Sequence, residues 1–332
     1  MILVRGRGRQ RLRYAVRRFL QAIPILVAIV TCNFFLLHLA PGDAASVLAG
    51  ESGSASEEYV AQLRHDFGLE KPLVLQYVDY VANVATLNFG HSFRYNRSNL
   101  GLIVERLGAT LLLMVTSFTI AISFGILLGA WAATHKGKAL DRGIRILAVV
   151  AYAAPVFWVA LMLIMVFALQ LGILPTSGMH RIGSRSSGLA TVLDVAQHLI
   201  LPSLSLSFFY LAVYTRLMRA ALLDQLGMNY TIVAEAKGAS PRQVLWRHAF
   251  RNAIIPVVTL AGLHIGSMLG GSVIVESVFG WPGLGLLAYQ ALFARDLNLL
   301  LGILIFSSVL VVAMNLLVDV VNSFVDPRIQ LK

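Results

Sequence analysis

Six long apolar runs, separated by polar segments, dominate the pattern of this chain. A helix needs about 20 largely apolar residues to cross the hydrocarbon core of a bilayer. The runs extend over residues 19–39, 107–134, 146–171, 199–218, 253–275 and 299–324. The pattern therefore predicts an all-α membrane protein with six transmembrane helices.

Composition supports this environment. Hydrophobic residues make up 58% of the chain and charged residues 13%, with a mean hydropathy of +0.76, which excludes an ordinary soluble domain. The first run follows a basic segment, as in a signal peptide. However, the run is long, and the residues after it, 40–43 (Ala-Pro-Gly-Asp), make a poor cleavage site, so we expect an uncleaved span.

Basic residues indicate the orientation. Of the 27 Lys and Arg residues, 19 lie in alternate segments, 1–18, 135–145, 216–251 and 323–332. Since Lys and Arg near a membrane are retained on the cytoplasmic side, both termini are predicted to be cytoplasmic. The net charge of +11 lies mostly beside span ends and does not point to nucleic acid.

The spans divide the chain into a basic cytoplasmic tail, a first transmembrane helix, an extracytoplasmic segment, a five-helix core with a cytoplasmic loop at 219–251, and a short cytoplasmic tail. Their predicted ranges are 1–18, 19–39, 40–106, 107–324 and 325–332.

Two short amphipathic helices are predicted in the extracytoplasmic segment. One follows a capping-box pattern from Ser54 to Glu57 and ends at Gly68, and the other starts at Pro72. They could receive a soluble partner or simply cover the span ends.

The loop between the fourth and fifth spans is polar but helix-forming. Ser240, Pro241 and Gln243 form an N-terminal capping pattern, so a helix should begin at Pro241. A preceding helix should end at Gly238, a residue suited to a left-handed turn. The small residues around this corner leave room for another protein to approach closely, which suggests a docking projection.

At this loop the sequence resembles the EAA loop of membrane subunits of bacterial ABC importers. The resemblance is to the dipeptide, oligopeptide and nickel uptake branch, and to the first of its two permeases. It rests on Ala234 to Gly238, His248 to Ala253, Pro256 to Thr259, His38 to Asp43, Phe67 to Pro72, Glu276 to Gly285, Arg295-Asp296 and Asp326 to Arg328. Ile232 and Val233 depart from the motif, which has Glu and Ala there.

The resemblance implies a type I ABC importer permease fold in the bacterial inner membrane. The implied partners are a second homologous permease, two cytoplasmic ABC ATPases that hold ATP and Mg, and an extracytoplasmic substrate-binding protein. Peptides are the implied substrate, with a nickel chelate, glutathione, an opine or a sugar as alternatives. The implied ATPase-coupling residues are Ala234, Glu235, Ala236, Lys237, Gly238, Ala239, Ser240 and Pro241.

The chain itself carries no phosphate-binding loop of the form G-x-x-x-x-G-K-[ST], so its energy must come from another polypeptide. No metal-ligand spacing or catalytic triad pattern is present either. We therefore expect no cofactor in this chain and no enzyme activity. A self-contained secondary transporter or channel is the alternative class.

Polar residues inside the spans are candidates for a transport path, because they are costly in lipid. The path candidates are Asn33, His264, Ser267 and Asn315, although His264 could instead form an interhelical hydrogen bond. Glu276, Trp281, Pro282 and Gly283 belong to a glycine- and proline-rich stretch that favours a re-entrant turn at the outer mouth. This turn is either a gate or a structural plug.

Two stripes of small residues predict close helix packing. One comprises Ala121, Gly125 and Gly129, and the other comprises Gly262, Gly266 and Gly270. Each could face a helix of this chain or the second permease, and we expect packing within the chain. Cys32, the one cysteine, is expected to be a small buried apolar side chain in the first span.

Overall fold

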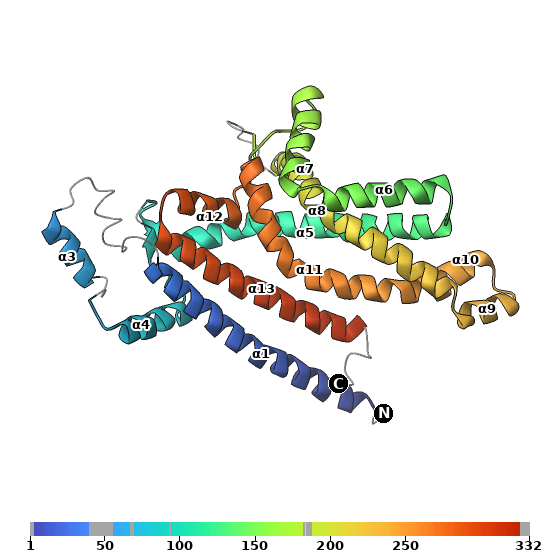
Figure 1. The fold of residues 1–332 in the computed structure, drawn as a ribbon, viewed down its shortest axis with the longest axis horizontal. Coiled ribbons are helices and arrows are strands. Elements are labelled where there is room, and N and C mark those ends of the chain that lie inside the picture. Colours follow the sequence, from blue (N-terminus) through green and yellow to red (C-terminus); the bar gives the residue numbers. More distant parts are fainter. Residues whose placement is uncertain are drawn as a thin grey trace.

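The computed structural model describes residues 3–39, 56–66, 70–92, 94–181, 183 and 188–325. Within these ranges the protein is a bundle of long helices with small elements at both ends (Figure 1). The predicted tail after residue 325, the predicted Ser54 cap, the helix end at Gly68 and the segment 40–55 lie outside the described residues.

Three helices form the centre of the bundle. These are α5 (Asn99–Thr134), α8 (Leu189–Leu226) and α11 (Phe250–Phe279), and α8 packs along both of the others. The largest cluster of buried apolar side chains lies between them. α13 (Leu297–Val325) packs on α11, and α1 (Leu3–Leu39) lies beside α13 at the edge of the bundle (Figure 1).

The small residues of the second predicted span, Ala121, Gly125 and Gly129, allow α5 and α8 to approach each other closely. A methyl group added at Gly125 would lie 2.6 Å from Tyr214 Cβ, and one at Gly129 would lie 2.6 Å from the Thr215 carbonyl oxygen. The prediction of packing within the chain is confirmed for this stripe. The other stripe does not act as a unit, because Gly266 faces Val311 and Asn315 of α13 whereas Gly270 has no neighbour within 4 Å.

The predicted third span, 146–171, is wrong as a single helix. Its residues form α6 (Ala139–Ala153), then α7 (Val156–Leu163) and a π-helix, η1 (Ile164–Gln170), and the two parts meet at an angle of 109°. Pro155 lies at the break, where its ring excludes a continuous helix and holds Ala154 in an extended conformation. In Figure 1, α7 turns away from the direction of α6, and it packs against α8 and α11.

The other predicted spans are helices, with different bounds. The basic residues expected in an N-terminal tail continue the helix of α1, whose apolar part covers Leu20–Leu36. Among the described residues, four helices are long and apolar enough to cross a membrane, or five when the bent pair counts as one span. The fifth predicted span is part of a longer continuous helix, Pro241–Phe279.

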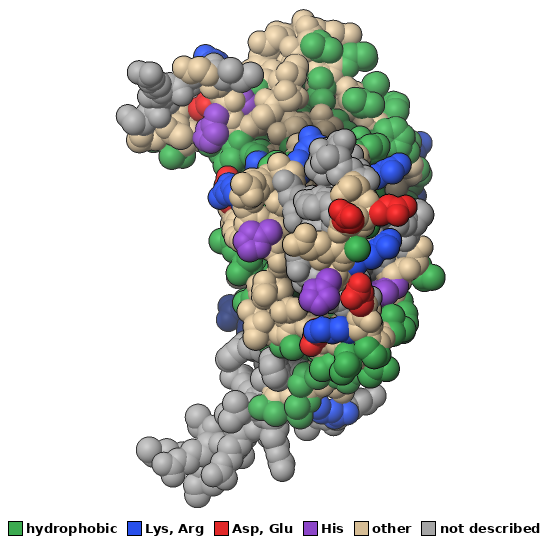
Figure 2. Space-filling model, turned by 90° about the vertical axis from the view of Figure 1, so that its left-hand side faces the viewer, with side chains coloured by type: hydrophobic (Ala, Val, Ile, Leu, Met, Phe, Trp, Pro, Cys, Tyr) green, Lys and Arg blue, Asp and Glu red, His purple; other side chains and the backbone are tan. Residues whose placement is uncertain are grey.

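One end of the bundle carries the small elements of the predicted extracytoplasmic segment. α3 (Glu57–Asp66) and α4 (Leu73–Ala85) are the two predicted short helices, with Pro72 at the N-cap of α4. A hairpin of β1 (His91–Ser92) and β2 (Arg97–Ser98) was not predicted; His91 pairs with Ser98. Figure 2 shows charged and histidine side chains gathered on this end, with hydrophobic side chains around its edges.

Candidate ATPase-coupling loop

The candidate coupling loop projects from the end of the bundle opposite α3 and α4 (Figure 1). It consists of α9 (Asn229–Ala236), a four-residue corner and α10 (Pro241–Gln243), which runs through a π-helix, η2 (Val244–Ala249), into α11. The predicted helix boundaries are confirmed here. Sequence alone identified them because capping residues and glycine act locally.

Gly238 makes the corner. Its φ is +87°, a left-handed conformation that side-chain-bearing residues rarely adopt, and its N–H donates to the Glu235 carbonyl at 2.8 Å. A methyl group added there would meet nothing within 4 Å. The glycine is therefore required by the backbone conformation, and the space around it is open.

Ser240 starts the second helix through a complete capping box. Its hydroxyl accepts from the Gln243 N–H at 3.4 Å, and its own N–H donates to Gln243 Oε1 at 3.0 Å. These bonds satisfy donors that the first helical turn leaves unpaired. Hydrogen bonds within the loop therefore fix the helix ends on both sides of the corner.

Side-chain hydrogen bonds tie α9 to the helices that enter and leave the loop. The Tyr230 hydroxyl donates to Gln225 Oε1 of α8 at 2.7 Å and accepts from Asn252 Nδ2 of α11 at 3.2 Å. The buried Thr231 hydroxyl bonds the carbonyls of Leu226 and Met228. Displacement of α9 is therefore transmitted to α8 and α11 together.

The outward face of α9 is apolar. Met228, Ile232 and Val233 expose 46%, 58% and 51% of their surfaces. Exposed apolar side chains grouped on a polar projection are typical of a protein contact. Sequence reasoning treated Ile232 and Val233 as departures from a motif and missed this face; the signal was an apolar pair within a polar loop.

A buried ion pair links the C-terminal part of α8 to the first turn of α6. Arg219 donates to both carboxylate oxygens of Asp141, at 2.6 and 2.8 Å, and Asp141 also accepts from the Gly137 N–H at 3.0 Å. Asp141 is 1% exposed and Arg219 21% exposed. Bidentate geometry makes this pair a directional link between the two helices. Sequence reasoning did not identify it, because the partners are 78 residues apart.

The candidate path residues fall into two places. His264 and Ser267 lie on α11 against Tyr210 of α8, with the Tyr210 hydroxyl 3.3 Å from Ser267 Oγ. Asn315 of α13 lies beside Gly266 on the neighbouring turn of α11. Asn33 lies instead on α1, where it is 5% exposed. Their role in a path stays a prediction.

Three of the four outer-gate candidates are buried in the turn that ends α11. Gly280, with φ +58°, ends the helix, and α12 (Leu284–Phe293) folds back against α5, α11 and α13. Trp281 Nε1 donates to the Ala109 carbonyl at 2.8 Å. Gly283 packs directly against the Glu276 carboxylate, and Pro282 is half-buried.

The Glu276 carboxylate organises this outer turn. It is fully buried, and it accepts from the N–H groups of Gly285 and Leu286 at the start of α12 and from the Thr110 hydroxyl of α5 at 2.8 Å. Thr110 in turn accepts from the Leu284 N–H at 2.8 Å. A carboxylate at a helix N-terminus is favourable because the unpaired N–H groups point at it. Whether the turn also gates a path stays a prediction.

The described residues hold no group of three or more His, Cys, Asp or Glu side chains that could bind a metal ion. Cys32 lies on α1 and is exposed, so the prediction that its side chain is buried is wrong.

A helical bundle of membrane-spanning length with a projecting cornered loop defines the class of protein: a multi-pass helical membrane protein. The family model described as the binding-protein-dependent transport system inner membrane component matches residues 125–331, and the model of its N-terminal region matches residues 11–116. The chain belongs to this family of inner membrane components. It is a non-catalytic permease subunit of an ABC importer and a multi-pass protein of the inner membrane.

Curated relatives match over almost the whole chain. The oligopeptide transport system permease protein AppB of Bacillus subtilis (strain 168) is 37% identical over 318 residues, covering 96% of this chain and 99% of the relative. The di/tripeptide transport system permease protein DppB of Pseudomonas aeruginosa (strain UCBPP-PA14) is 35% identical, with 96% and 99% covered. A putative peptide permease protein of Brucella suis biovar 1 (strain 1330) is 36% identical, with the same coverage.

Solved structures show the same fold. A chain of the MetNI methionine ABC transporter, in an inward-facing conformation, aligns with a TM-score of 0.54 and 18% identity, covering 68% of this chain and 97% of that one. A second crystal form gives a TM-score of 0.55. The core of the chain therefore has the type I importer permease fold.

Proposed function

We propose that this chain forms one half of a peptide-translocation path across the bacterial inner membrane, driven by ATP hydrolysis in partner subunits. Peptides are favoured because curated relatives that match nearly the full length are named as permeases for peptides, oligopeptides and di/tripeptides. A second, homologous permease would enclose the other half, and an extracytoplasmic binding protein would deliver the substrate.

The observation that carries the coupling role is the cornered loop tied to two spans. Its exposed apolar face, Met228, Ile232 and Val233, offers a contact surface to a cytoplasmic ATPase. The hydrogen bonds of Tyr230 would pass movement of that partner to α8 and α11. ATP and Mg would be bound by the two ATPases.

The orientation proposed from the basic residues fits the arrangement of the helices. The first described turn of α1 and the last turn of α13 lie at the same end of the molecule as α9 and α10 (Figure 1). If the loop meets a cytoplasmic ATPase, both termini are then cytoplasmic. The charged end shown in Figure 2 would face the binding protein.

The coupling role is tested by Gly238→Glu in the assembled transporter. The left-handed backbone and the exposed corner predict that this variant inserts and assembles but hydrolyses ATP without importing peptide. Gly137→Glu is the matched control, because Gly137 also has a left-handed φ, +79°, and open space around it, but lies in another loop. ATP hydrolysis and peptide uptake are measured in the same proteoliposomes. Wild-type uptake by Gly238→Glu would refute the assignment of the loop.

The substrate is tested separately on the cognate binding protein. A thermal-shift screen with di- and oligopeptides, nickel chelates, glutathione, opines and sugars should show stabilisation by peptides. Stabilisation by another class alone would replace the peptide assignment without affecting the coupling role.

A further inference from the structure

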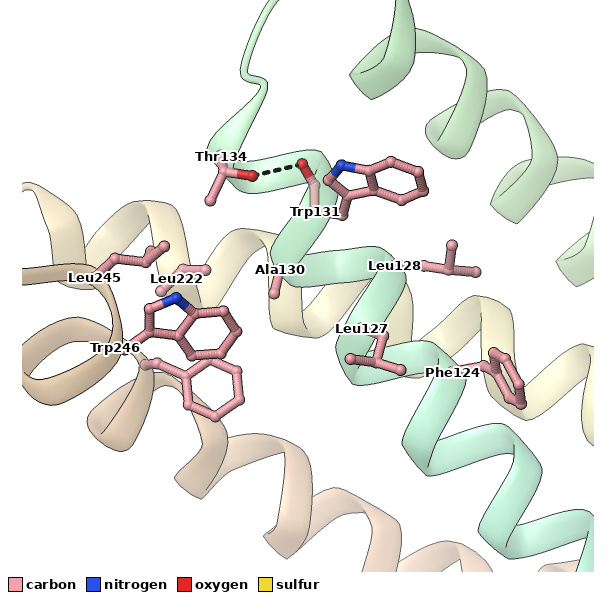
Figure 3. A pocket seen from close by; sticks show the side chains of 10 residues that line it. Phe124, Leu127, Leu128, Ala130, Trp131, Thr134, Leu222, Leu245 and Trp246 are labelled. Atoms are coloured by element: carbon pink, nitrogen blue, oxygen red, sulfur yellow. Dashed lines mark hydrogen bonds between the residues drawn. The ribbon is translucent and has the colours of Figure 1, made fainter. Parts of the chain in front are cut away.

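An apolar groove opens on the side of the bundle next to the candidate coupling loop. It has a volume of about 460 Å³, which lies within the range of ligand pockets, about 300–1,000 Å³. Figure 3 shows Leu222, Leu245 and Trp246 on one side, Phe124, Leu127 and Trp131 on the other, and Ala130 between them.

Two half-exposed indoles place this groove at the boundary of the membrane. Trp131 and Trp246 expose 53% and 51% of their surfaces on opposite walls. Tryptophan is enriched at the level of the headgroups, where its apolar ring and polar N–H meet both environments. Directly beyond Trp131 the apolar helix α5 gives way to the basic loop at 135–138, which agrees with that level.

The π-helix η2 builds one wall. Val244 and Ala249 are buried against the bundle, while Leu245, Trp246 and Phe250 line the groove. Trp246 packs on Phe250 with ring centroids 4.9 Å apart. Single π-helical turns inside longer helices are often found at functional sites.

Two arginines directly follow groove-lining residues in the sequence. Arg247 and Arg251 are exposed next to the lining residues Trp246 and Phe250, and neither forms an ion pair with a carboxylate within the part of the chain that the structure describes.

We propose that the groove binds one acyl chain of an anionic phospholipid from the cytoplasmic leaflet, with the phosphate held by Arg247 and Arg251. An apolar slot with two exposed arginines next to its lining residues matches both parts of such a lipid. A partner helix fits the groove less well, because close helix contacts use small residues and this groove is lined by leucine and aromatic side chains. The small-residue stripe of α5 already packs on α8. This proposal depends on membrane embedding and not on the coupling role.

The test uses the complete transporter reconstituted in phosphatidylcholine vesicles that contain phosphatidylglycerol with brominated acyl chains. Bromine quenches nearby tryptophan, and the difference between wild type and Trp246→Phe isolates the signal of Trp246. We expect half-maximal quenching at a mole fraction about thirtyfold lower with brominated phosphatidylglycerol than with brominated phosphatidylcholine, the effect of about two basic residues beside an anionic lipid.

Arg247→Gln/Arg251→Gln should abolish this preference. Arg142→Gln/Arg242→Gln, which removes two exposed charges from the same end of the molecule, should retain it. Equal quenching of wild type by the two brominated lipids would overturn the proposal and needs no variant. An equal loss of the phosphatidylglycerol preference in both double variants would also overturn it. So would a Trp246 signal that neither brominated lipid quenches, because that would show that protein covers the groove.

Discussion

Gly129→Ala probes how closely α5 must approach α8. The added methyl group would lie 2.6 Å from the Thr215 carbonyl oxygen and 2.7 Å from Met218 Cβ, whereas ordinary contacts begin at 3.4 Å. The shortfall from the carbonyl oxygen is therefore 0.8 Å. Neither neighbour is the end of a flexible side chain, so relief requires movement of the helices themselves.

Gly108→Ala is the matched control on the same helix, because a methyl group at Gly108 meets nothing within 4 Å. Both substitutions gain the same preference of alanine for helix, about 0.5–1 kcal/mol. The difference between the variants therefore isolates overpacking, which costs typically about 1–3 kcal/mol. We expect the upper half of that range, because two rigid neighbours are hit together.

The assay is the fraction of detergent-solubilised transporter that stays monodisperse after heating, read by size-exclusion chromatography across a temperature series. Gly129→Ala should lose its peak at a clearly lower temperature than Gly108→Ala and wild type. Identical melting of the two variants would show that α5 and α8 are not in contact at this position, and would refute the reasoning from the small-residue stripe.

Three further predictions follow from the hydrogen bonds and the ion pair. Thr110→Val should lower the free energy of unfolding by about 1–3 kcal/mol, because it leaves a buried oxygen of the Glu276 carboxylate and the Leu284 N–H without their partner. The control Thr119→Val loses only a hydrogen bond within its own helix and should melt like wild type. Ser240→Ala should lose about 1 kcal/mol of local helix stability, seen as faster hydrogen exchange at the amides of residues 242–244 with no change at α8. Asp141→Arg should reduce the amount of assembled transporter in the membrane, and the charge-exchanged pair Asp141→Arg/Arg219→Asp should recover part of it; no recovery would show that the two side chains do not interact directly.

Features that depend on neighbouring residues were predictable from sequence. The cap at Ser240, the left-handed corner at Gly238 and the start of α4 near Pro72 each follow from the conformational preference of one or two residues. The same is true of the second, fourth, fifth and sixth predicted spans, which are helices long and apolar enough to cross a membrane, because lipid requires long apolar runs. The first predicted span holds a shorter apolar stretch, Leu20–Leu36.

Features that depend on tertiary partners were not predictable. The stripe at Gly125 and Gly129 identified a close contact but not α8 as its partner, since small residues fit against any helix. The burial of Trp281 depends on a carbonyl of α5 that is 172 residues away. The break at Pro155 could have been found locally, because proline inside an apolar run is a known helix breaker, but the length of the run favoured a single span.

These contacts also define which part of the bundle must follow the coupling loop. The loop is bonded to α8 and α11 through Tyr230, α8 is locked to α5 at Gly129, and Arg219 fixes α8 to the first turn of α6. Closely packed helices transmit displacement to one another, because protein interiors have low compressibility. If the loop moves with a partner, we therefore expect α5, α6, α8 and α11 to move with it. α7 packs on α8 and α11, so we expect it to follow them, and any rearrangement between α6 and α7 to fall at the 109° break at Pro155.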